Sequence, residues 1–279
     1  MKKYIVLLVL LLLLLPMFFF SGKEEEKKPS KPVLRVGSEC DYVPNSWETL
    51  TPTEFNFPIV NHAGYYADGY DIHIAKLVAS QLDYALEVRK IAWNDLLPSL
   101  NRGEIDVIFS SMLDTEERRV IAAFSDPYEV RKTEYGIIVE SVSPYITAKT
   151  LSDFSGAKII GEKGTKLDDV IVQIPGVVHL KPVDTIQGMV DAVAGGKADG
   201  AVIDIDTGHF YEIINKNLTL IKFSDDKGFQ LGFRGVCAGV RKGDRELLHR
   251  INLALSVIEL SERQKIMDAV NSRMATTLR

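Results

Sequence analysis

The sequence predicts an α/β fold with mainly parallel sheets. Segments with the period of an amphipathic helix alternate along the chain with short apolar runs that suit buried strands. This alternation is typical of sheets whose strands are connected by helices. The 279 residues are 46% hydrophobic and 25% charged, which is enough to bury one large core or two modest ones.

The first run of elements contains strands and helices in turn. We expect strands at 34–38, 86–91 and 105–109, helices at 71–82 and 94–101, and a further helix that begins at Thr115. The helix over 71–82 is supported by Ile74, Val78 and Leu82, which lie on one apolar face. These elements form one βα lobe.

A second run of the same kind begins near residue 141. We expect strands at 158–160, 177–180, 200–203 and 218–221, and helices at 167–173, 185–194 and 206–214. The tail is helical again, over 245–258 and 261–272. The sequence therefore predicts two α/β lobes.

A weak internal repeat connects the two lobes. Residues 103–108 (GEIDVI) and 196–201 (GKADGA) each follow a helix and lead into an apolar strand. Their superposition places Ser111 and Asp204 at equivalent strand ends. Ligands of open α/β sheets bind beyond the carboxyl ends of the strands, so we expect Ser111 and Asp204 to face one ligand.

The segment after the strand at 105–109 has the character of a carboxylate site. Its side chains Ser110, Ser111, Thr115 and Arg118 surround one anion-sized space just beyond the strand end. Asp204 would approach from the other lobe. A guanidinium suits a carboxylate and a carboxylate suits an ammonium group, so the pattern favours a zwitterionic ligand.

The N-terminus predicts export. Two lysines at positions 2 and 3 precede an apolar run over 5–20, which is typical of a signal peptide or a short membrane anchor within residues 1–20. Residues 21–32, rich in Lys, Glu, Ser and Pro, read as a flexible tether. We expect the protein in the periplasm or at the outer face of the cytoplasmic membrane.

Charge and composition narrow the function further. The formal net charge of −5 comes with no basic face, so we expect no nucleic-acid partner. The five histidines have no paired metal-ligand spacing, and we assign no metal and no cofactor. Cys40 and Cys237 could pair, but two distant thiols in apolar contexts are more often separate buried residues.

Many short motifs, in order from 34 to about 273, carry a resemblance to a known family. They are LRVGSECDYVP (34–44), GYDIHIA (69–75), WNDLLPSL (93–100), GEIDVIFSSM (103–112), TEER (115–118), FSDPY (124–128), GEKGT (161–165), ADGAVID (198–204) and AGVRKGD (238–244). The chain resembles the amino-acid-binding solute receptors of ABC importers, the polar amino-acid group that includes the histidine-, glutamine- and lysine/arginine/ornithine-binding proteins. Any one motif alone would be weak.

The resemblance implies a type II periplasmic-binding-protein fold with two lobes and two hinge strands. Residues 33–134 with 236–279 would form lobe 1, and residues 135–235 would form lobe 2. The chain would cross between the lobes near 128–139 and return near 231–240. Closure of the lobes would bury the ligand, and the closed form would dock on a membrane permease.

The resemblance also assigns roles to residues. Arg118 would grip the α-carboxylate, with donors from Ser111 and the turn at Thr165 and Lys166. Asp204 would take the α-ammonium. The side-chain end of the ligand would meet an acid and two aromatic rings, which are Glu39, Tyr42 and Trp93.

Two departures from the family pattern concern the ligand. Leu113 stands where many relatives have Ser or Thr donating to the carboxylate, so Lys166 and backbone amides would have to compensate or the head group would differ. The long segment 47–68 could form a lid on the side-chain pocket or narrow it.

Simpler interpretations of the site residues stay open. Arg118 alone would more simply be a surface charge, and Asp204 could cap a helix. Tyr42 and Trp93 could be core aromatics. Ser110 is most simply a loop hydroxyl bonded to backbone.

We therefore expect a monomeric receptor that is not an enzyme and that delivers a polar amino acid to an ABC permease. An acid at Glu39 beside aromatic rings favours lysine, arginine, ornithine, histidine or glutamine, in that order. The alternatives are an enzyme on the same fold, resembling dehydratases that act on cyclic carboxylic acids, with Lys166 and Glu39 as general acids, and a ligand sensor module.

Overall fold

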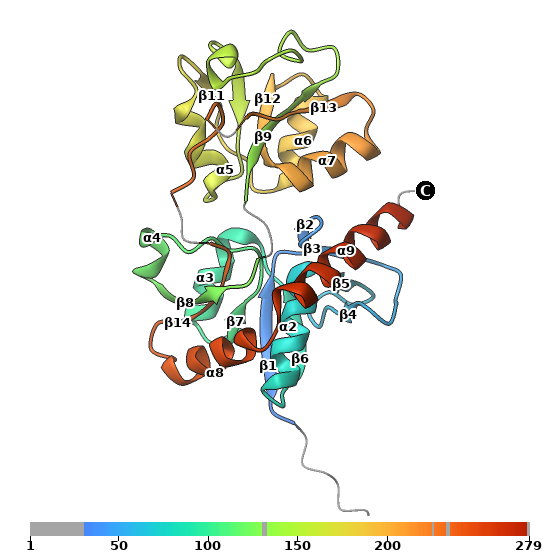
Figure 1. Ribbon diagram of the computed structural model, residues 1–279, viewed down its shortest axis with the longest axis vertical. Helices are drawn as coiled ribbons and strands as arrows, with labels where there is room; N and C mark the ends of the chain where they lie inside the picture. Colours follow the sequence, from blue (N-terminus) through green and yellow to red (C-terminus); the bar gives the residue numbers. More distant parts are fainter. Residues whose placement is uncertain (1–30, 130–132, 225, 233–234, 278–279) are drawn as a thin grey trace, which may run out of the picture. The chain divides into compact units, whose positions relative to one another are not determined.

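The computed structural model describes residues 31–129, 133–224, 226–232 and 235–277 (Figure 1). The predicted export segment lies outside the described residues, and so does most of the predicted tether. From Pro32 onward the chain forms one compact unit. Its strands form two five-stranded sheets and one four-stranded sheet. Among the helices of the described residues, none has both the length and the hydrophobicity that crossing a bilayer requires.

The first five-stranded sheet has the strand order β6-β1-β7-β14-β8. Its strands are β1 (Val33–Ser38), β6 (Ala85–Lys90), β7 (Val107–Ile108), β8 (Ala122–Pro127) and β14 (Cys237–Arg241). β1 pairs in parallel with β6 and β7, whereas β14 pairs antiparallel with β7 and β8. The strands predicted at 34–38 and 86–91 are confirmed. The strand predicted at 105–109 is shorter than expected.

The second five-stranded sheet has the strand order β11-β10-β12-β9-β13. Its strands are β9 (Tyr135–Glu140), β10 (Lys158–Ile160), β11 (Val178–His179), β12 (Gly200–Asp204) and β13 (Leu218–Ile221). β10 pairs in parallel with β11 and β12, whereas β9 pairs antiparallel with β12 and β13. The strands predicted in this part of the chain are confirmed.

The prediction of mainly parallel sheets holds for strand direction, because in each sheet only one strand, β14 or β9, runs against the other four; its pairings with its two neighbours are antiparallel. The antiparallel pairs arise where the chain changes sheets. β9 follows β8 of the first sheet, and β14 follows β13 of the second. β9 begins where β12 ends, with Tyr135 opposite Asp204. A strand that enters at this end must run against its parallel neighbours. The two crossings themselves confirm the two predicted hinge strands.

Helices flank both sheets. The longer ones are α2 (Tyr70–Gln81), α3 (Trp93–Asn101), α6 (Ile186–Ala194), α7 (Ile205–Ile214), α8 (Arg245–Ser256) and α9 (Leu260–Thr277). Short turns of helix are α4 (Glu116–Arg119), α5 (Lys166–Asp169) and the 3₁₀ turns η1 (Leu151–Phe154) and η2 (Val170–Gln173). The single helix predicted at 167–173 is therefore two short turns, α5 and η2.

The first sheet buries a different hydrophobic cluster on each face. α2 packs against α8 and α9, and their apolar side chains meet Val36 and Val107. α3 contacts β1, β7 and β14, and its Leu96 and Leu100 meet Ile108. Val107 and Ile108 point to opposite faces because successive strand residues alternate. Burial on both faces fixes the strand ends that carry the site.

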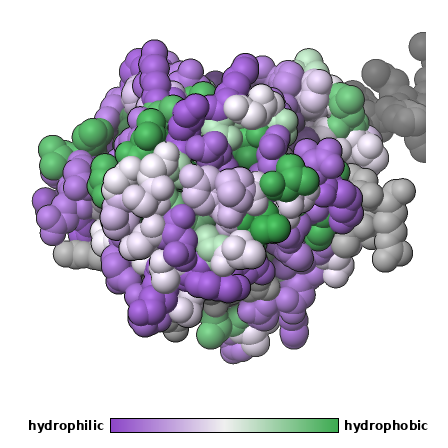
Figure 2. All heavy atoms as spheres, turned by 90° about the horizontal axis from the view of Figure 1, so that it is seen from above, coloured by the Kyte–Doolittle hydropathy of each residue, from purple (hydrophilic) through white to green (hydrophobic). Residues whose placement is uncertain are grey.

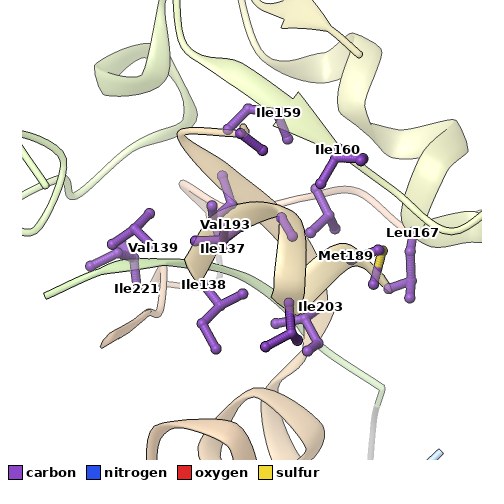
Figure 3. Close-up of a cluster of buried hydrophobic side chains, with 14 of the residues drawn as sticks. Ile137, Ile138, Val139, Ile159, Ile160, Leu167, Met189, Val193, Ile203 and Ile221 are labelled. Atoms are coloured by element: carbon purple, nitrogen blue, oxygen red, sulfur yellow. The ribbon is translucent and has the colours of Figure 1, made fainter. Parts of the chain in front are cut away.

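The second sheet has one large hydrophobic core, in which isoleucines and valines predominate (Figure 3). Ile137 and Ile203 come from β9 and β12, and Met189 and Val193 come from α6; all four are buried completely. On the face seen in Figure 2, hydrophobic residues lie in small separate groups among hydrophilic ones.

The segment after β1 forms a small sheet that the sequence analysis did not predict. Its strands are β2 (Asp41–Tyr42), β3 (Ser46–Thr49), β4 (Phe57–Pro58) and β5 (Tyr66–Asp68), in the order β2-β3-β5-β4. Ala67, Ile72 and Val88 are buried where this sheet meets α2 and β6. The strands are two to four residues long, which is too short for a clear alternating pattern.

The sheet topology confirms the internal repeat. β7 and β12 occupy the same central position in their sheets. The carboxylate of Asp106 accepts a hydrogen bond from the backbone N–H of Arg35 at 3.1 Å. Equivalently, the carboxylate of Asp199 accepts one from the backbone N–H of Lys158 at 2.7 Å. The two acids thus fix β1 and β10 in the same way.

These equivalent acids allow a matched stability test. Asp106 also pairs with the guanidinium groups of Arg35 and Arg241, at 2.7 and 3.4 Å. We expect Asp106→Ala to lower the free energy of unfolding by about 2–3 kcal/mol and Asp199→Ala by about 1 kcal/mol, as measured by urea denaturation. Asp184→Ala, whose side chain is 77% exposed, is the control. Equal losses for the two repeat positions would contradict this account.

Candidate functional site

Nine of the ten predicted site residues line one cavity of about 840 Å³, a volume that includes its opening to solvent. They are Glu39, Tyr42, Trp93, Ser110, Ser111, Arg118, Thr165, Lys166 and Asp204. Thr115 is the exception. Its side chain caps α4 by accepting a hydrogen bond from the backbone N–H of Arg118 at 3.3 Å. None of residues 47–68 lines the cavity, so the predicted lid is wrong.

The cavity lies at the carboxyl ends of strands from both sheets. Glu39 follows β1, and Ser110 and Ser111 follow β7. Glu162 lies two residues beyond β10, and Asp204 ends β12. Parallel strands bring their carboxyl ends to one edge of a sheet, and this placement explains how residues far apart in the sequence meet.

Arg118 is a half-buried cation in this cavity. Its Nη1 donates to the carbonyl of Leu113 at 2.9 Å and its Nη2 to the carbonyl of Gly164 at 3.3 Å. The guanidinium lies 5.0 Å from the centre of the Trp93 ring. Burial lowers the pKa of Arg118. Within the described part of the chain no carboxylate pairs with it, so the predicted surface-charge alternative does not describe its environment.

Asp204 is a buried acid on the other side of the cavity. Its Oδ1 accepts a hydrogen bond from the backbone N–H of Asp206 at 2.9 Å and so caps α7. Burial, with a smaller effect of the nearby Asp206 charge, raises the pKa of Asp204 to about 7. No Lys or Arg of the described residues forms an ion pair with it. The capping interpretation is therefore right, and the carboxylate has no cationic partner among these residues.

Gly164 carries contacts between the lobes. Its carbonyl accepts from Trp93 Nε1 at 2.9 Å as well as from Arg118. The φ of Gly164 is +74°, and an added Cβ would lie 2.5 Å from the Asn94 side chain. Any other residue would be strained here. A further hydrogen bond between the lobes runs from Thr207 Oγ1 to the carbonyl of Val43 at 2.6 Å.

Asp71 is a cavity residue that the sequence analysis did not assign. It is fully buried in α2 and accepts hydrogen bonds from Tyr128 at 2.8 Å and from Ser111 Oγ at 3.0 Å. Burial raises its pKa to about 7. Ser111 has a φ of +48°, so Asp71 holds a strained residue in place. The only signal in the sequence was its position in the GYDIHIA motif.

The two hydroxyls of Ser110 and Thr165 are occupied by backbone. Ser110 Oγ accepts from the N–H of Glu39 at 3.0 Å, as the simpler interpretation predicted. Thr165 Oγ1 donates to the carbonyl of Glu162 at 2.8 Å and caps α5 by accepting from the N–H of Leu167. These bonds shape the two strand ends around the cavity.

Four further residues named in the sequence analysis, Lys166, Leu113, Cys40 and Cys237, have defined surroundings. Lys166 Nζ pairs with Asp169 at 3.0 Å. Leu113 offers its carbonyl to Arg118 and bridges to Val236 in antiparallel fashion. Cys40 and Cys237 are both buried and free, which confirms the expectation of separate residues.

Glu162 is a further cavity residue that the sequence analysis did not assign. It lies in the GEKGT motif, is 3% exposed, and meets Glu39, which is 6% exposed. Burial raises the pKa of both acids, and each is raised further by a neighbouring charge, from Glu39 at Glu162 and from Asp41 at Glu39. The sequence repeat does not reach Glu162, because its equivalence to Glu39 follows from the pairing of β1 with β7 and of β10 with β12.

Two α/β lobes that the chain links twice, with a cavity at their strand ends, define the type II periplasmic-binding-protein fold. The family model of the bacterial extracellular solute-binding proteins, family 3, matches residues 34–270. The chain therefore belongs to this family.

Individual relatives agree with the family match. ABC transporter arginine-binding protein 1 of Escherichia coli is 28% identical over 203 residues, which cover 72% of this chain and 80% of the relative. The arginine-binding extracellular protein ArtP of Bacillus subtilis is 26% identical, over 68% and 72% of the two chains. An ancestral arginine-binding protein, solved with arginine and with glutamine, is 27% identical with a TM-score of 0.68. Both structures cover 86% of this chain; the match spans 98% of the chain solved with arginine and 97% of the chain solved with glutamine.

The raised pKa of Asp204 predicts how stability depends on pH. An unfolded Asp has a pKa near 4, whereas burial raises the folded value to about 7. The folded state then holds the proton more tightly, so the contribution is full below about pH 4 and is lost as the pH rises through 7. Asp204→Asn keeps the cap and removes this loss.

We therefore expect ligand-free Asp204→Asn to gain several degrees of melting temperature relative to the wild type when the pH is raised from 5.5 to 8. Differential scanning calorimetry of both proteins measures this gain. Asp191→Asn, on the exposed side of α6, should show none. A difference between Asp204→Asn and wild type that stays constant with pH would contradict the buried, raised acid.

Proposed function

We propose that this protein is the extracytoplasmic receptor of an ABC importer and that it captures a free amino acid between its two lobes. One observation carries the proposal: Arg118 and Asp204 line the same cavity, and neither is paired with an opposite charge among the described residues. A buried unpaired charge is costly. One zwitterion supplies both missing partners, a carboxylate for Arg118 and an ammonium for Asp204.

The side chain of the ligand is proposed to be basic or an amide. Glu39 and Glu162 give its end of the cavity acidic groups, and Tyr42 and Trp93 add aromatic surface. Acids pair with cations, and rings stack on a guanidinium or an alkyl stem. The names of relatives support this, since several are called arginine-binding and one ancestral protein was solved with arginine and glutamine.

Capture and delivery follow from the two-lobed fold. We propose that residues 33–134 with 236–279 and residues 135–235 move as two bodies about the two crossings. Contacts at Gly164, such as the Trp93 hydrogen bond, would form on closure. The closed, monomeric receptor would then dock on its permease outside the cytoplasmic membrane, as export by residues 1–20 requires.

An enzyme on this fold is the second candidate, because raised acids in a cavity also suit proton transfer. Glu39 and Lys166 were the candidate acids, and Lys166 already pairs with Asp169. Incubation of the protein with amino acids and cyclic carboxylic acids decides the matter by mass spectrometry. Stoichiometric binding without turnover supports the receptor, and turnover supports the enzyme.

A thermal-shift screen tests the proposed function directly. The protein is heated with each of the twenty amino acids, ornithine and small carboxylic acids that lack an amine. A ligand that binds only the folded state raises the melting temperature. A rise with one or a few basic or amide amino acids is expected. A rise only with the amine-free acids would refute the role of Asp204.

Variants of the two unpaired charges give a sharper prediction. Arg118→Ala should weaken amino-acid binding by about 3–5 kcal/mol, because the ligand carboxylate loses its buried partner. This loss raises the dissociation constant at least about a hundredfold in calorimetry. Arg102→Ala is the control, since that side chain is exposed and pairs with Glu104. Retained wild-type affinity in Arg118→Ala would refute the assigned role.

A further inference from the structure

We propose that Glu39 and Glu162 form one subsite that spans both lobes, that the closed lobes hold a single proton between them, and that the cationic side-chain group of a ligand takes the place of that proton. This inference rests on the proposed function. It adds a second residue that determines specificity, Glu162, and it predicts that basic ligands release more protons on binding than neutral ligands of the same shape.

The internal repeat shows that the two acids are structural equivalents. Val36 and Gly37 of β1 pair with Val107 and Ile108 of β7. Ile159 and Ile160 of β10 pair in the same way with Gly200 and Ala201 of β12. The repeat superposes 107–108 on 200–201, so 36–37 superposes on 159–160. Two residues further along, Glu39 falls on Glu162. The two lobes thus bring matching strand ends, each with an acid, to one cavity.

The two carboxyl groups are buried and meet each other. Glu39 is 6% exposed and Glu162 is 3% exposed, and their side chains are in hydrogen-bonding contact. Oε1 of Glu162 is buried, and no donor of the described residues reaches it. Carboxylates only accept, so a hydrogen bond between two of them needs one proton. With that proton the pair carries one negative charge.

The neighbouring charged groups do not replace that proton. On the side of Glu39, Lys90 of β6 donates to Glu48 of β3 at 2.7 Å. Asp41 of β2 adds another negative charge to the site.

On the side of Glu162, Asp184 is also acidic, and the nearby Lys163 pairs with it at 3.6 Å. The backbone N–H of Trp93, at the start of α3, donates to the carboxyl of Glu39. It favours ionisation of Glu39 and leaves the proton on Glu162. The pKa of both acids is raised, first by burial.

A cationic group of the ligand supplies the hydrogen-bond donors and the positive charge that the two carboxyl groups lack. A guanidinium has five N–H donors in a planar fork and reaches two carboxylates at once. On binding, the O–H bond of Glu162 breaks and its proton leaves to solvent, so a carboxylic acid, a carboxylate and a cation become two carboxylates, a cation and a free proton. A neutral amide has no charge to exchange, so the proton stays.

Arginine and citrulline are matched probes, because they have the same shape and citrulline lacks the charge. Each is titrated into the wild-type protein at pH 7 by calorimetry in phosphate and in Tris, whose ionisation enthalpies differ. The difference in heat gives the number of protons released. Asp204 contributes equally with both ligands. We expect arginine to release about one proton more than citrulline.

Glu162→Gln tests the residue itself. We expect this variant to abolish the difference in proton release between arginine and citrulline. It should weaken the binding of arginine at least tenfold and change the affinity for citrulline less than threefold. Asp184→Asn removes a nearby acid that does not line the cavity and should leave the difference unchanged.

Three outcomes would overturn the subsite. The first is equal proton release by the two ligands in the wild type. The second is arginine release that Glu162→Gln leaves unchanged. The third is binding of neutral amino acids with no binding of arginine or lysine, which leaves the receptor function intact. Failure of every amino acid to bind would instead refute the proposed function.

Discussion

Charge without a partner is the constraint on which the cavity depends. Arg118 meets carbonyls and an aromatic ring rather than an acid, and Asp204 meets backbone N–H groups rather than a base. Each arrangement holds the side chain in place without neutralising it. Burial raises the cost of every such charge, and the protein tolerates it because the bonds that cap α7 and reach Leu113 are fixed by the surrounding fold. In the proposed function a zwitterion would supply both partners and so remove that cost.

The duplicated lobe explains how so few residues make a complete site. Each lobe offers the same strand ends, and the repeat relates Ser111 to Asp204 and Glu39 to Glu162. The first pair differs, with a hydroxyl in one lobe and an acid in the other, so this end of the cavity is asymmetric. The second pair is acidic in both lobes, so its two carboxylates repel each other unless a proton or a cation lies between them. In the proposed receptor, this difference between the two pairs would orient the ligand.

The sequence was sufficient for the features that rest on period and on strand ends. The hydrophobic pattern predicts α2 and the strands around it. The rule that parallel strands end at one edge of a sheet predicts that the site residues lie close together, and nine of them do. The reversed direction of β9 and β14 did not follow, because it results from the crossing of the chain between the sheets and no local signal records it. The sheet β2–β5 has strands too short for a pattern. Glu162 and Asp71 lie in the motifs at 161–165 and 69–75, but only the structure shows which side chains they contact. Thr115 was predicted to bind the ligand because a capping hydroxyl and a binding hydroxyl look alike in sequence.

The most direct test of the account compares one amino acid with two of its fragments. With the ligand that gives the largest thermal shift, calorimetry measures the dissociation constants of the intact amino acid, of its decarboxylated amine and of its des-amino acid. Each fragment is predicted to bind at least about a hundredfold more weakly than the intact amino acid, since each leaves one buried charge unpaired. In Arg118→Ala the penalty for the missing carboxylate should vanish. A decarboxylated amine that binds as tightly as the amino acid would contradict the pairing of Arg118 with a carboxylate, and with it the proposed basis of recognition.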